Sequence, residues 1–180
     1  MNSCCDPPAV TIKPMRSRPI FAFILFVLLS MSCAGERPAP KIELPPGISL
    51  HLPKSDSAGS FFWDRFGGTT NPLTEKAIVV NNWEQIRIQG WLLNSQHTSL
   101  AGGVELAIDG KPFQLPYGVS RQDVADAFNN TALTKCGFDT SISAASLGQP
   151  GIHRIALRIL SPDGQTYTES PQLTITNQRS

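Results

Sequence analysis

Strong charge of either sign is missing from this 180-residue sequence. Fifteen Lys and Arg residues stand against fourteen Asp and Glu residues, which leaves a formal net charge of +1. Proteins that bind nucleic acid carry basic patches that neutralise phosphates, and here no basic run is longer than a pair of nearby arginines. The sequence therefore argues against nucleic acid as a partner.

Cysteine is scarce as well, with Cys4, Cys5, Cys33 and Cys136 making up the whole set. The first two precede Met15, which we interpret as the true start because the polar, proline-containing stretch before it is unlike the start of a signal peptide. If Cys33 is a lipid attachment site, only Cys136 is left in the folded part, so no intramolecular disulfide can form. We expect this lone thiol to be a small buried hydrophobe.

Long apolar runs are absent except near the amino end. In the stretch MRSRPIFAFILFVLLSMSCA (15–34), Arg16 and Arg18 precede an unbroken apolar run of ten residues, 20–29. A transmembrane helix needs ~20 such residues. Positive charge followed by a short apolar run is typical of a secretory signal peptide, so residues 1–34 are predicted to be a signal peptide region.

The end of this signal allows two interpretations. LSMSC (29–33) resembles the lipobox of bacterial lipoproteins, in which the cysteine, here Cys33, is acylated and becomes the first residue. The alternative is ordinary cleavage after Ala34, with Ser32 and Ala34 as the small residues that the peptidase requires. The resemblance implies a membrane partner through a lipid anchor. With alanine at the second mature position, it also implies an outer-membrane lipoprotein that faces the periplasm or cell surface.

Residues 35–60 are rich in proline and show no sustained periodicity. Proline-rich segments without alternation adopt semi-extended conformations and serve as spacers. The sequence therefore predicts a linker over 35–60 and a folded domain over 61–177.

The folded domain is predicted to be all-β. Strand-like alternation recurs in EQIRIQGWLLN (84–94), GVELAIDGKPFQL (103–115) and GIHRIALRILSPDG (151–164). Asp109-Gly110 between two alternating runs is a strong hairpin signal. Seven or so short strands in about 115 residues are typical of an antiparallel β-sandwich of immunoglobulin or fibronectin type.

One short helical phrase, GVSRQDVADAF (118–128), interrupts this pattern. Ser120 is predicted to be its N-cap, with Asp123 completing an approximate capping box. Val124 and Phe128 lie one turn apart and are expected to seal one end of the sandwich. Arg121 at the positive end of a helix requires a carboxylate or free carbonyls as partners.

A series of short motifs in this region is similar to a β-sandwich module of bacterial surface and membrane proteins that often accompanies glycosyltransferases and sugar-active enzymes. In chain order the motifs are GW (Gly90, Trp91), DG (Asp109, Gly110), R-x-D-V (Arg121, Asp123, Val124), GF (Gly137, Phe138) and G-x-H (Gly151, His153). The resemblance implies an accessory domain and not a catalytic one. On this basis the expected structural framework is Trp91, Asp109, Gly110, Ser120, Arg121, Asp123, Val124, Phe138 and His153.

No residue pattern supports catalysis, a metal or a cofactor. His51, His97 and His153 lie in the linker, a loop and a strand, and no pair of them has metal-ligand spacing. Asp123 and Asp126 resemble the carboxylate pair of a glycosidase, but capping explains the first and solvation the second. We therefore expect that the protein is not an enzyme.

Aromatic residues are the remaining candidates for a binding surface. The candidate binding aromatics are Phe61, Phe62, Trp63, Trp83 and Tyr117; the alternative is that Trp63 and Trp91 only fill the core. Exposed rings stack on sugars or form protein contacts. The expected function is a non-catalytic, envelope-anchored module that binds a protein or glycan partner. The alternative is a carbohydrate-binding accessory factor of a polysaccharide or glycosyltransferase system.

Overall fold

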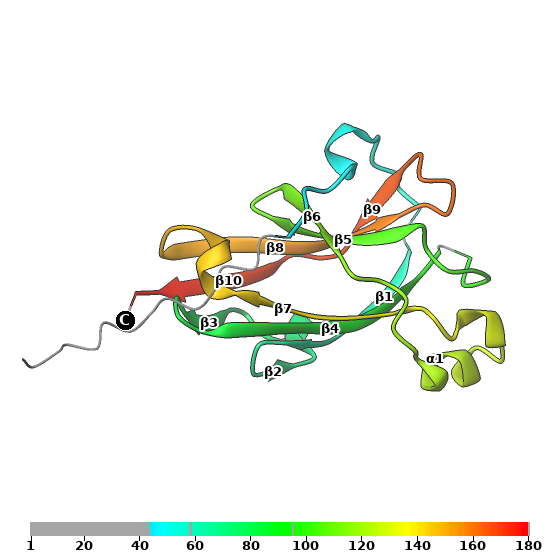
Figure 1. Cartoon of the computed structure of the whole chain (residues 1–180), viewed down its shortest axis with the longest axis horizontal. Helices are drawn as coiled ribbons and strands as arrows, with labels where there is room; N and C mark the ends of the chain where they lie inside the picture. Colours follow the sequence, from blue (N-terminus) through cyan, green and yellow to red (C-terminus); the bar gives the residue numbers. More distant parts are fainter. Residues whose placement is uncertain (1–43, 58, 95, 180) are drawn as a thin grey trace, which may run out of the picture. The chain divides into compact units, whose positions relative to one another are not determined.

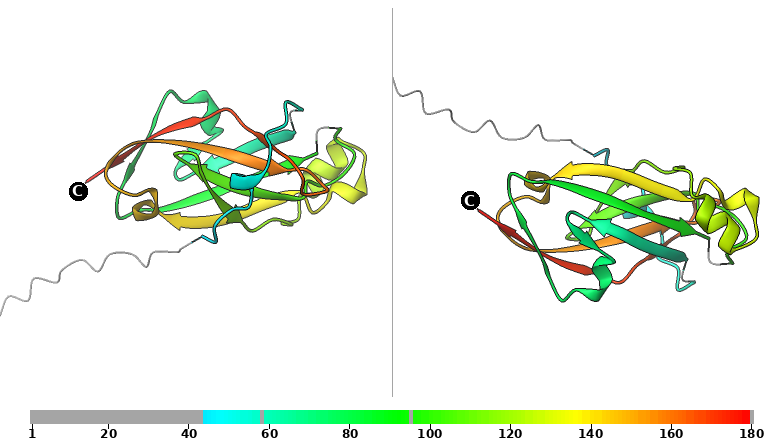
Figure 2. Two further views of the ribbon diagram at one scale, coloured as in Figure 1. Left: turned by 90° about the horizontal axis from the view of Figure 1, so that it is seen from above. Right: turned by 90° about the horizontal axis from the view of Figure 1, so that it is seen from below.

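Short strands dominate the chain from Ser60 to Gln178, where β-branched and aromatic residues alternate with polar ones. The computed structural model describes residues 44–57, 59–94 and 96–179. Ten strands in these residues form two sheets that pack face to face (Figures 1 and 2). The protein is therefore an all-β sandwich, as the sequence predicts.

The two sheets are of unequal size. The four-stranded sheet has the order β2-β1-β4-β7, with bounds β1 Ser60–Phe66, β2 Thr69–Thr70, β4 Gln85–Leu93 and β7 Gly137–Ser143. The six-stranded sheet has the order β3-β10-β8-β5-β6, and β9 pairs with β8. Its bounds are β3 Ile78–Asn81, β5 Gly103–Ile108, β6 Lys111–Leu115, β8 Gly151–Leu160, β9 Tyr167–Glu169 and β10 Leu173–Gln178. The named strands pair antiparallel throughout except β3 with β10, which are parallel.

The inner face of β4 confirms the predicted alternation. Ile86, Ile88 and Leu92 are fully buried between the sheets. Gly90 continues this face, and a Cβ built on it would lie 2.2 Å from the Phe62 carbonyl oxygen and 2.6 Å from the Phe138 ring. Only glycine fits at this point, because β1 and the Phe138 side chain leave no room for a side chain.

The predicted Asp109-Gly110 hairpin is confirmed between β5 and β6. Asp109 has φ 49° and Gly110 has φ 82°. Positive φ at both central residues is the signature of a type I′ turn, whose twist matches that of the flanking strands.

Aromatic side chains fill the core between the sheets. Trp63, Phe66 and Phe138 are fully buried. The ring of Trp63 meets those of Phe66 and Phe138 edge to face, with centroids 6.0 Å and 6.2 Å apart. The interpretation of Trp63 as a binding aromatic is therefore wrong, because its ring is inaccessible.

The predicted linker differs from the structure, because residues 44–57 pack on the six-stranded sheet. Pro46 forms a bridge with Phe113, and the amide of Gly47 donates to the Pro112 carbonyl at 2.8 Å. The buried carboxylate of Glu105 accepts a hydrogen bond from the amide of Ile48 at 2.6 Å. We call residues 44–57 the amino-terminal segment. The folded unit therefore begins before residue 61, while the signal peptide region, Cys33 and residues 35–43 lie outside the described residues.

The helical phrase forms α1 (Gln122–Ala127) at the end of the sandwich opposite to the end of β10 (Figure 1). Its N-cap is Arg121 and no side chain caps it, so the prediction that Ser120 is the N-cap is wrong. Val124 is buried in a second, smaller cluster with Leu93, Leu133 and Cys136. Phe128 remains 37% exposed, so only Val124 seals this end.

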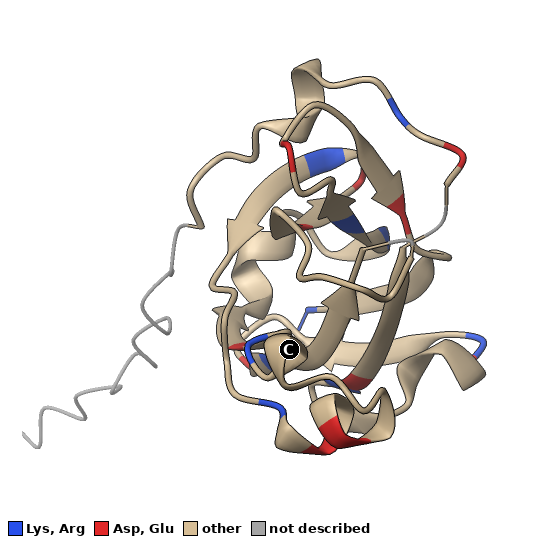
Figure 3. Cartoon of the chain, turned by 90° about the vertical axis from the view of Figure 1, so that its right-hand side faces the viewer, with Lys and Arg blue, Asp and Glu red and all other residues tan. Residues whose placement is uncertain are grey.

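The remaining helical segments are single 3₁₀ turns: η1 Ser49–His51, η2 Pro72–Thr74, η3 Thr131–Leu133 and η4 Ala144–Leu147. Within the described ranges, no helix has the length and apolar character needed to cross a membrane. Positive and negative residues are interspersed over the ribbon and do not gather by sign on one side (Figure 3).

Candidate binding surface at the helical end

Four aromatic rings gather on the outer face of the four-stranded sheet beside α1. Phe62 of β1 and Trp91 of β4 are directly opposite each other across the two strands, and their ring planes are 18° apart with centroids at 6.4 Å. The Trp91 ring meets the edge of Phe128 at 6.0 Å, and Phe128 meets His97 at 5.4 Å. We call Phe62, Trp91, Phe128 and His97 the aromatic row.

The aromatic row is accessible and yet firmly supported. Phe62 is 41% exposed and Phe128 is 37% exposed, whereas Trp91 is half-buried. Trp91 packs against the small cluster that contains Leu93 and Val124. The row is therefore anchored from below by a packed core, and its outer rings face solvent.

A charged network borders the row. Arg121 binds the carboxylate of Asp123 through Nε and Nη2 at 2.8 Å and 2.7 Å, and its Nη1 donates to Asp64 Oδ2 at 2.5 Å. Asp64 follows Phe62 by two residues on β1, and Gly137, over which the Arg121 side chain packs, pairs with Trp91. The network and the row thus occupy one continuous patch of the sheet.

Within this network, electrostatics favour the ionised forms of Arg121 and Asp123. Hydrogen bonding to Asp123, followed by the proximity of Asp64, raises the pKa of Arg121 above its already high usual range. The bond from Arg121 lowers the pKa of Asp123. The side chain of Arg121 is only 18% exposed, and its bonds to the carboxylates of Asp123 and Asp64 offset the cost of placing a cation beside the first turn of α1.

The other candidate aromatics are dispersed. Phe61 is half-buried against the main core, and the Tyr117 hydroxyl donates to the Leu92 carbonyl at 2.9 Å. Burial raises the pKa of this hydroxyl. Trp83 is 55% exposed, but it lies in the turn before β4, about 20 Å along that strand from Trp91. Of the candidate aromatics, the structure places only Phe62 in the aromatic row.

Sequence reasoning missed His97 and Phe128 as members of the patch. Neither residue is near Phe62 in the chain: His97 lies in the β4–β5 loop, and Phe128 ends α1. No local pattern indicates which loop folds back over which strand. The spacing of Phe128 from Val124, one helical turn, predicts that Phe128 is buried and not exposed on a surface.

The remaining framework residues lie elsewhere. His153 Nδ1 is 2.7 Å from Asp109 Oδ2, and His153 Nε2 is 2.9 Å from the Gln149 carbonyl. Nothing in the part of the chain that the structure describes brings His153 together with Arg121 and Asp123. The thiol of Cys136 is buried, and burial raises its pKa. Across residues 44–57, 59–94 and 96–179, no group of three or more His, Cys, Asp or Glu residues is arranged to hold a metal ion.

A distantly similar fold occurs among solved structures. No family model matches the chain, and a comparison with curated proteins finds no match. Among solved structures, the endo-beta-1,4-mannanase from Thermotoga petrophila matches with 6% sequence identity and a TM-score of 0.41. The match covers 70% of this chain and 21% of the mannanase chain. The fold and its surface thus define an all-β sandwich with an exposed aromatic row, and this distant likeness adds nothing about function.

Proposed function

We propose that this protein is a non-catalytic binding module that contacts a protein or glycan partner through the aromatic row. The observation that carries the proposal is the exposure of Phe62 and Phe128 around a supported Trp91. Clustered exposed rings cost solvation free energy, and soluble proteins keep such patches mainly at contact sites. Rigid aromatic rings also bind with little loss of conformational entropy.

The charged residues beside the row support binding over turnover. Arg121 is held by Asp123 and Asp64, and each of these carboxylates is bound by the same guanidinium. Groups that are paired in this way in the resting state stabilise the fold and set the shape of the patch. They are poorly placed to accept or donate a proton.

A second candidate, a carbohydrate-binding accessory factor of a polysaccharide or glycosyltransferase system, is supported by the near-parallel rings of Phe62 and Trp91. Sugar rings pack their apolar faces on aromatic rings, and planar groups such as the Arg121 guanidinium bond to hydroxyls. A glycan and a protein partner therefore use the same patch differently.

We expect Phe62→Ala to abolish or strongly weaken partner binding, because it removes one of the two near-parallel rings. Capture of envelope proteins by the full chain and binding to a glycan array measure the two partner classes in parallel. Trp83→Ala is the matched control, since it removes an exposed ring outside the row, 55% exposed against 41% for Phe62. Equal binding by both variants and the unaltered protein would exclude the aromatic row as the contact site.

The proposed setting is the cell envelope, with the sandwich anchored at Cys33 as an outer-membrane lipoprotein. The support is the short apolar run and the LSMSC stretch that ends in Cys33. Metabolic labelling with a palmitate analogue is expected to mark the unaltered protein and not the Cys33→Ser variant. Labelling that persists in Cys33→Ser, or is absent from both, contradicts the anchor.

We also propose that the sandwich is of immunoglobulin type. In that fold the first, second and fifth strands share one sheet, and the third, sixth and last strands lie in that order in the other. Here β1, β4 and β7 are consecutive in one sheet, and β10-β8-β5-β6 are consecutive in the other. The parallel pairing of β3 with β10 fits a first strand that is divided between the sheets.

A further inference from the structure

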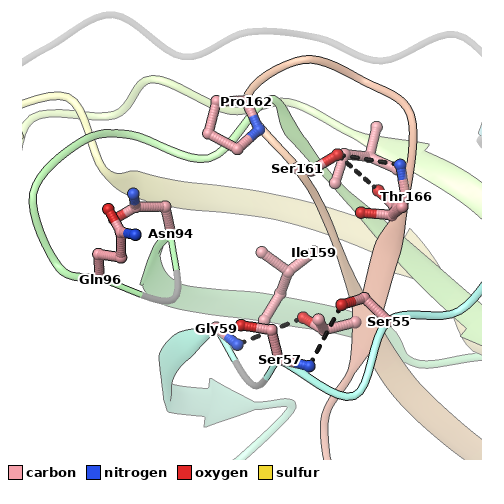
Figure 4. A pocket seen from close by; sticks show the side chains of 11 residues that line it. Ser55, Ser57, Gly59, Asn94, Gln96, Ile159, Ser161, Pro162 and Thr166 are labelled. Atoms are coloured by element: carbon pink, nitrogen blue, oxygen red, sulfur yellow. Dashed lines mark hydrogen bonds between the residues drawn. The ribbon is translucent and has the colours of Figure 1, made fainter.

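A pocket shares the β4–β5 loop with the aromatic row. It has a volume of about 310 Å³ (Figure 4). Three parts of the chain form it: Ser55, Ser57 and Gly59 before β1, Asn94 and Gln96 after β4, and the end of β8 with the turn and strand that follow. Its volume is near the lower end of the ~300–1,000 Å³ typical of small-molecule sites. A single ring-sized ligand fits this space.

The lining of the pocket is polar but uncharged. Hydroxyl and amide side chains form most of the wall: Ser55, Ser57, Asn94, Gln96, Ser161 and Thr166. Ile159 and Pro162 add apolar surface. No lining side chain is ionisable, so a charged ligand would lose water here without meeting a counter-charge, which is costly. A neutral ligand that combines hydroxyls with an apolar face has no such cost.

Part of the wall is already fixed by internal hydrogen bonds. The Ser161 hydroxyl donates to Asp163 Oδ1 at 2.5 Å and accepts from the Thr166 amide at 3.0 Å. Asn94 Oδ1 accepts from the amide of Thr98 at 3.0 Å. These bonds hold both sides of the pocket in place before any ligand arrives.

Other lining groups keep their hydrogen-bonding capacity unused. Among the described residues, the Gln96 amide and the Ser57 hydroxyl have no hydrogen-bond partner within the protein, and both are exposed residues that line the pocket. Asn94 Nδ2 donates one hydrogen to Thr98 Oγ1 at 3.3 Å, which leaves its second hydrogen free. Asn94, Gln96 and Ser57, from two separate segments, thus line the pocket with donors and acceptors that a ligand can use.

We propose that this pocket binds a neutral sugar residue. Sugar hydroxyls both donate and accept, which matches the mixed capacity of Gln96, Ser57 and Asn94, and the apolar face of the ring matches Ile159 and Pro162. The proposal rests on the binding role of the module and deepens it by naming the ligand class. The pocket and the aromatic row then contact successive parts of one glycan on the two sides of the β4–β5 loop.

Saturation-transfer NMR on the full chain, in a detergent without a sugar headgroup, tests this directly. The probes are glucose, galactose, mannose and N-acetylglucosamine, with glucosamine and glucuronic acid as charged analogues. We expect transfer to at least one neutral sugar and to neither charged analogue. Gln96→Ala is expected to weaken binding about three- to tenfold, the effect of one net hydrogen bond. Gln172→Ala, an exposed glutamine outside the pocket, is the matched control and is expected to bind as the unaltered protein does.

Three results would contradict the proposed sugar site: no saturation transfer to any neutral sugar, equal transfer to the charged analogues, or equal sugar affinity of Gln96→Ala and Gln172→Ala. Because Gln96 makes no hydrogen bond to the rest of the described chain, its replacement leaves the fold intact. The two proposals fail separately. If Phe62→Ala loses partner capture and no sugar gives a signal, the proposal for the aromatic row stands and the proposal for the pocket is excluded. A sugar signal that persists in Phe62→Ala supports the pocket as a separate binding site.

Discussion

At the scale of single residues, the buried ring of His153 has a hydrogen-bond partner at each of its two nitrogens. Both ring nitrogens face acceptors, the Asp109 carboxylate and the Gln149 carbonyl, so the protonated ring satisfies both. Burial lowers the pKa of His153, but the bonds to Asp109 and Gln149 outweigh this and raise it above the usual value. Arg154 also faces this carboxylate, through its amide at 2.9 Å from Asp109 Oδ1.

This arrangement predicts a pH-dependent stability. Because the folded pKa of His153 is raised, its contribution is fully present below the unfolded pKa of about 6.5 and is lost as pH rises through the folded value. The pKa of Asp109 is lowered, so its own contribution is lost only in acid, outside this window. We expect the melting temperature to fall as pH rises above about 6.5, the unfolded pKa of His153. The fall should be smaller in His153→Gln, and equal slopes in both proteins would contradict the assignment.

Arg121 provides a second residue-scale prediction. Arg121→Ala leaves the partly buried Asp64 and the exposed Asp123 without their partner, so we expect a loss of about 1–2 kcal/mol in the free energy of unfolding. Urea denaturation measures this loss. Arg87→Ala, which breaks an exposed pair with Asp139, is the control and should lower the urea midpoint much less than Arg121→Ala does. If the two variants unfold at the same urea concentration, Arg121 is held for binding and not for stability.

At the scale of elements, strands that alternate were predictable and the segments that cover them were not. The inner face of β4 and the Asp109-Gly110 turn follow from side-chain period and turn chemistry alone. The amino-terminal segment has neither a strand period nor a turn signal, and most of its hydrogen bonds to the sheet are made by its backbone amides. The one sequence signal for its docking lies in its partner strand, where Glu105 is a charged residue among apolar ones.

Glu105 makes this docking testable. Its carboxylate accepts from the amides of Ile48 and Ser49, and it is completely buried. Glu105→Ala removes the acceptor, so we expect faster hydrogen exchange at these two amides and a loss of about 1–3 kcal/mol in stability. Glu105→Gln keeps an acceptor oxygen, so its exchange rate at these amides should lie between those of Glu105→Ala and the unaltered protein. Unchanged exchange in Glu105→Ala would show that the segment is held by its other contacts alone.

At the scale of the whole molecule, the sequence predicts the architecture better than the surface. Burial patterns require two sheets around one core, and Trp63, Phe66 and Phe138 fill it. The aromatic row depends on long-range placement, since His97 and Phe128 reach the row from a loop and a helix end. Tertiary packing decides which loop covers which strand, so local sequence patterns do not predict it.

The central claim, that the aromatic row is where this protein meets its partner, is tested most directly by photo-crosslinking in intact cells. A photoreactive phenylalanine analogue replaces Phe128 in one strain and Trp83 in another, so that two exposed aromatic positions are compared on the same fold. The account predicts crosslinked protein or glycan adducts from position 128 and few or none from position 83. Adducts that form equally at both positions, or only at 83, would contradict it.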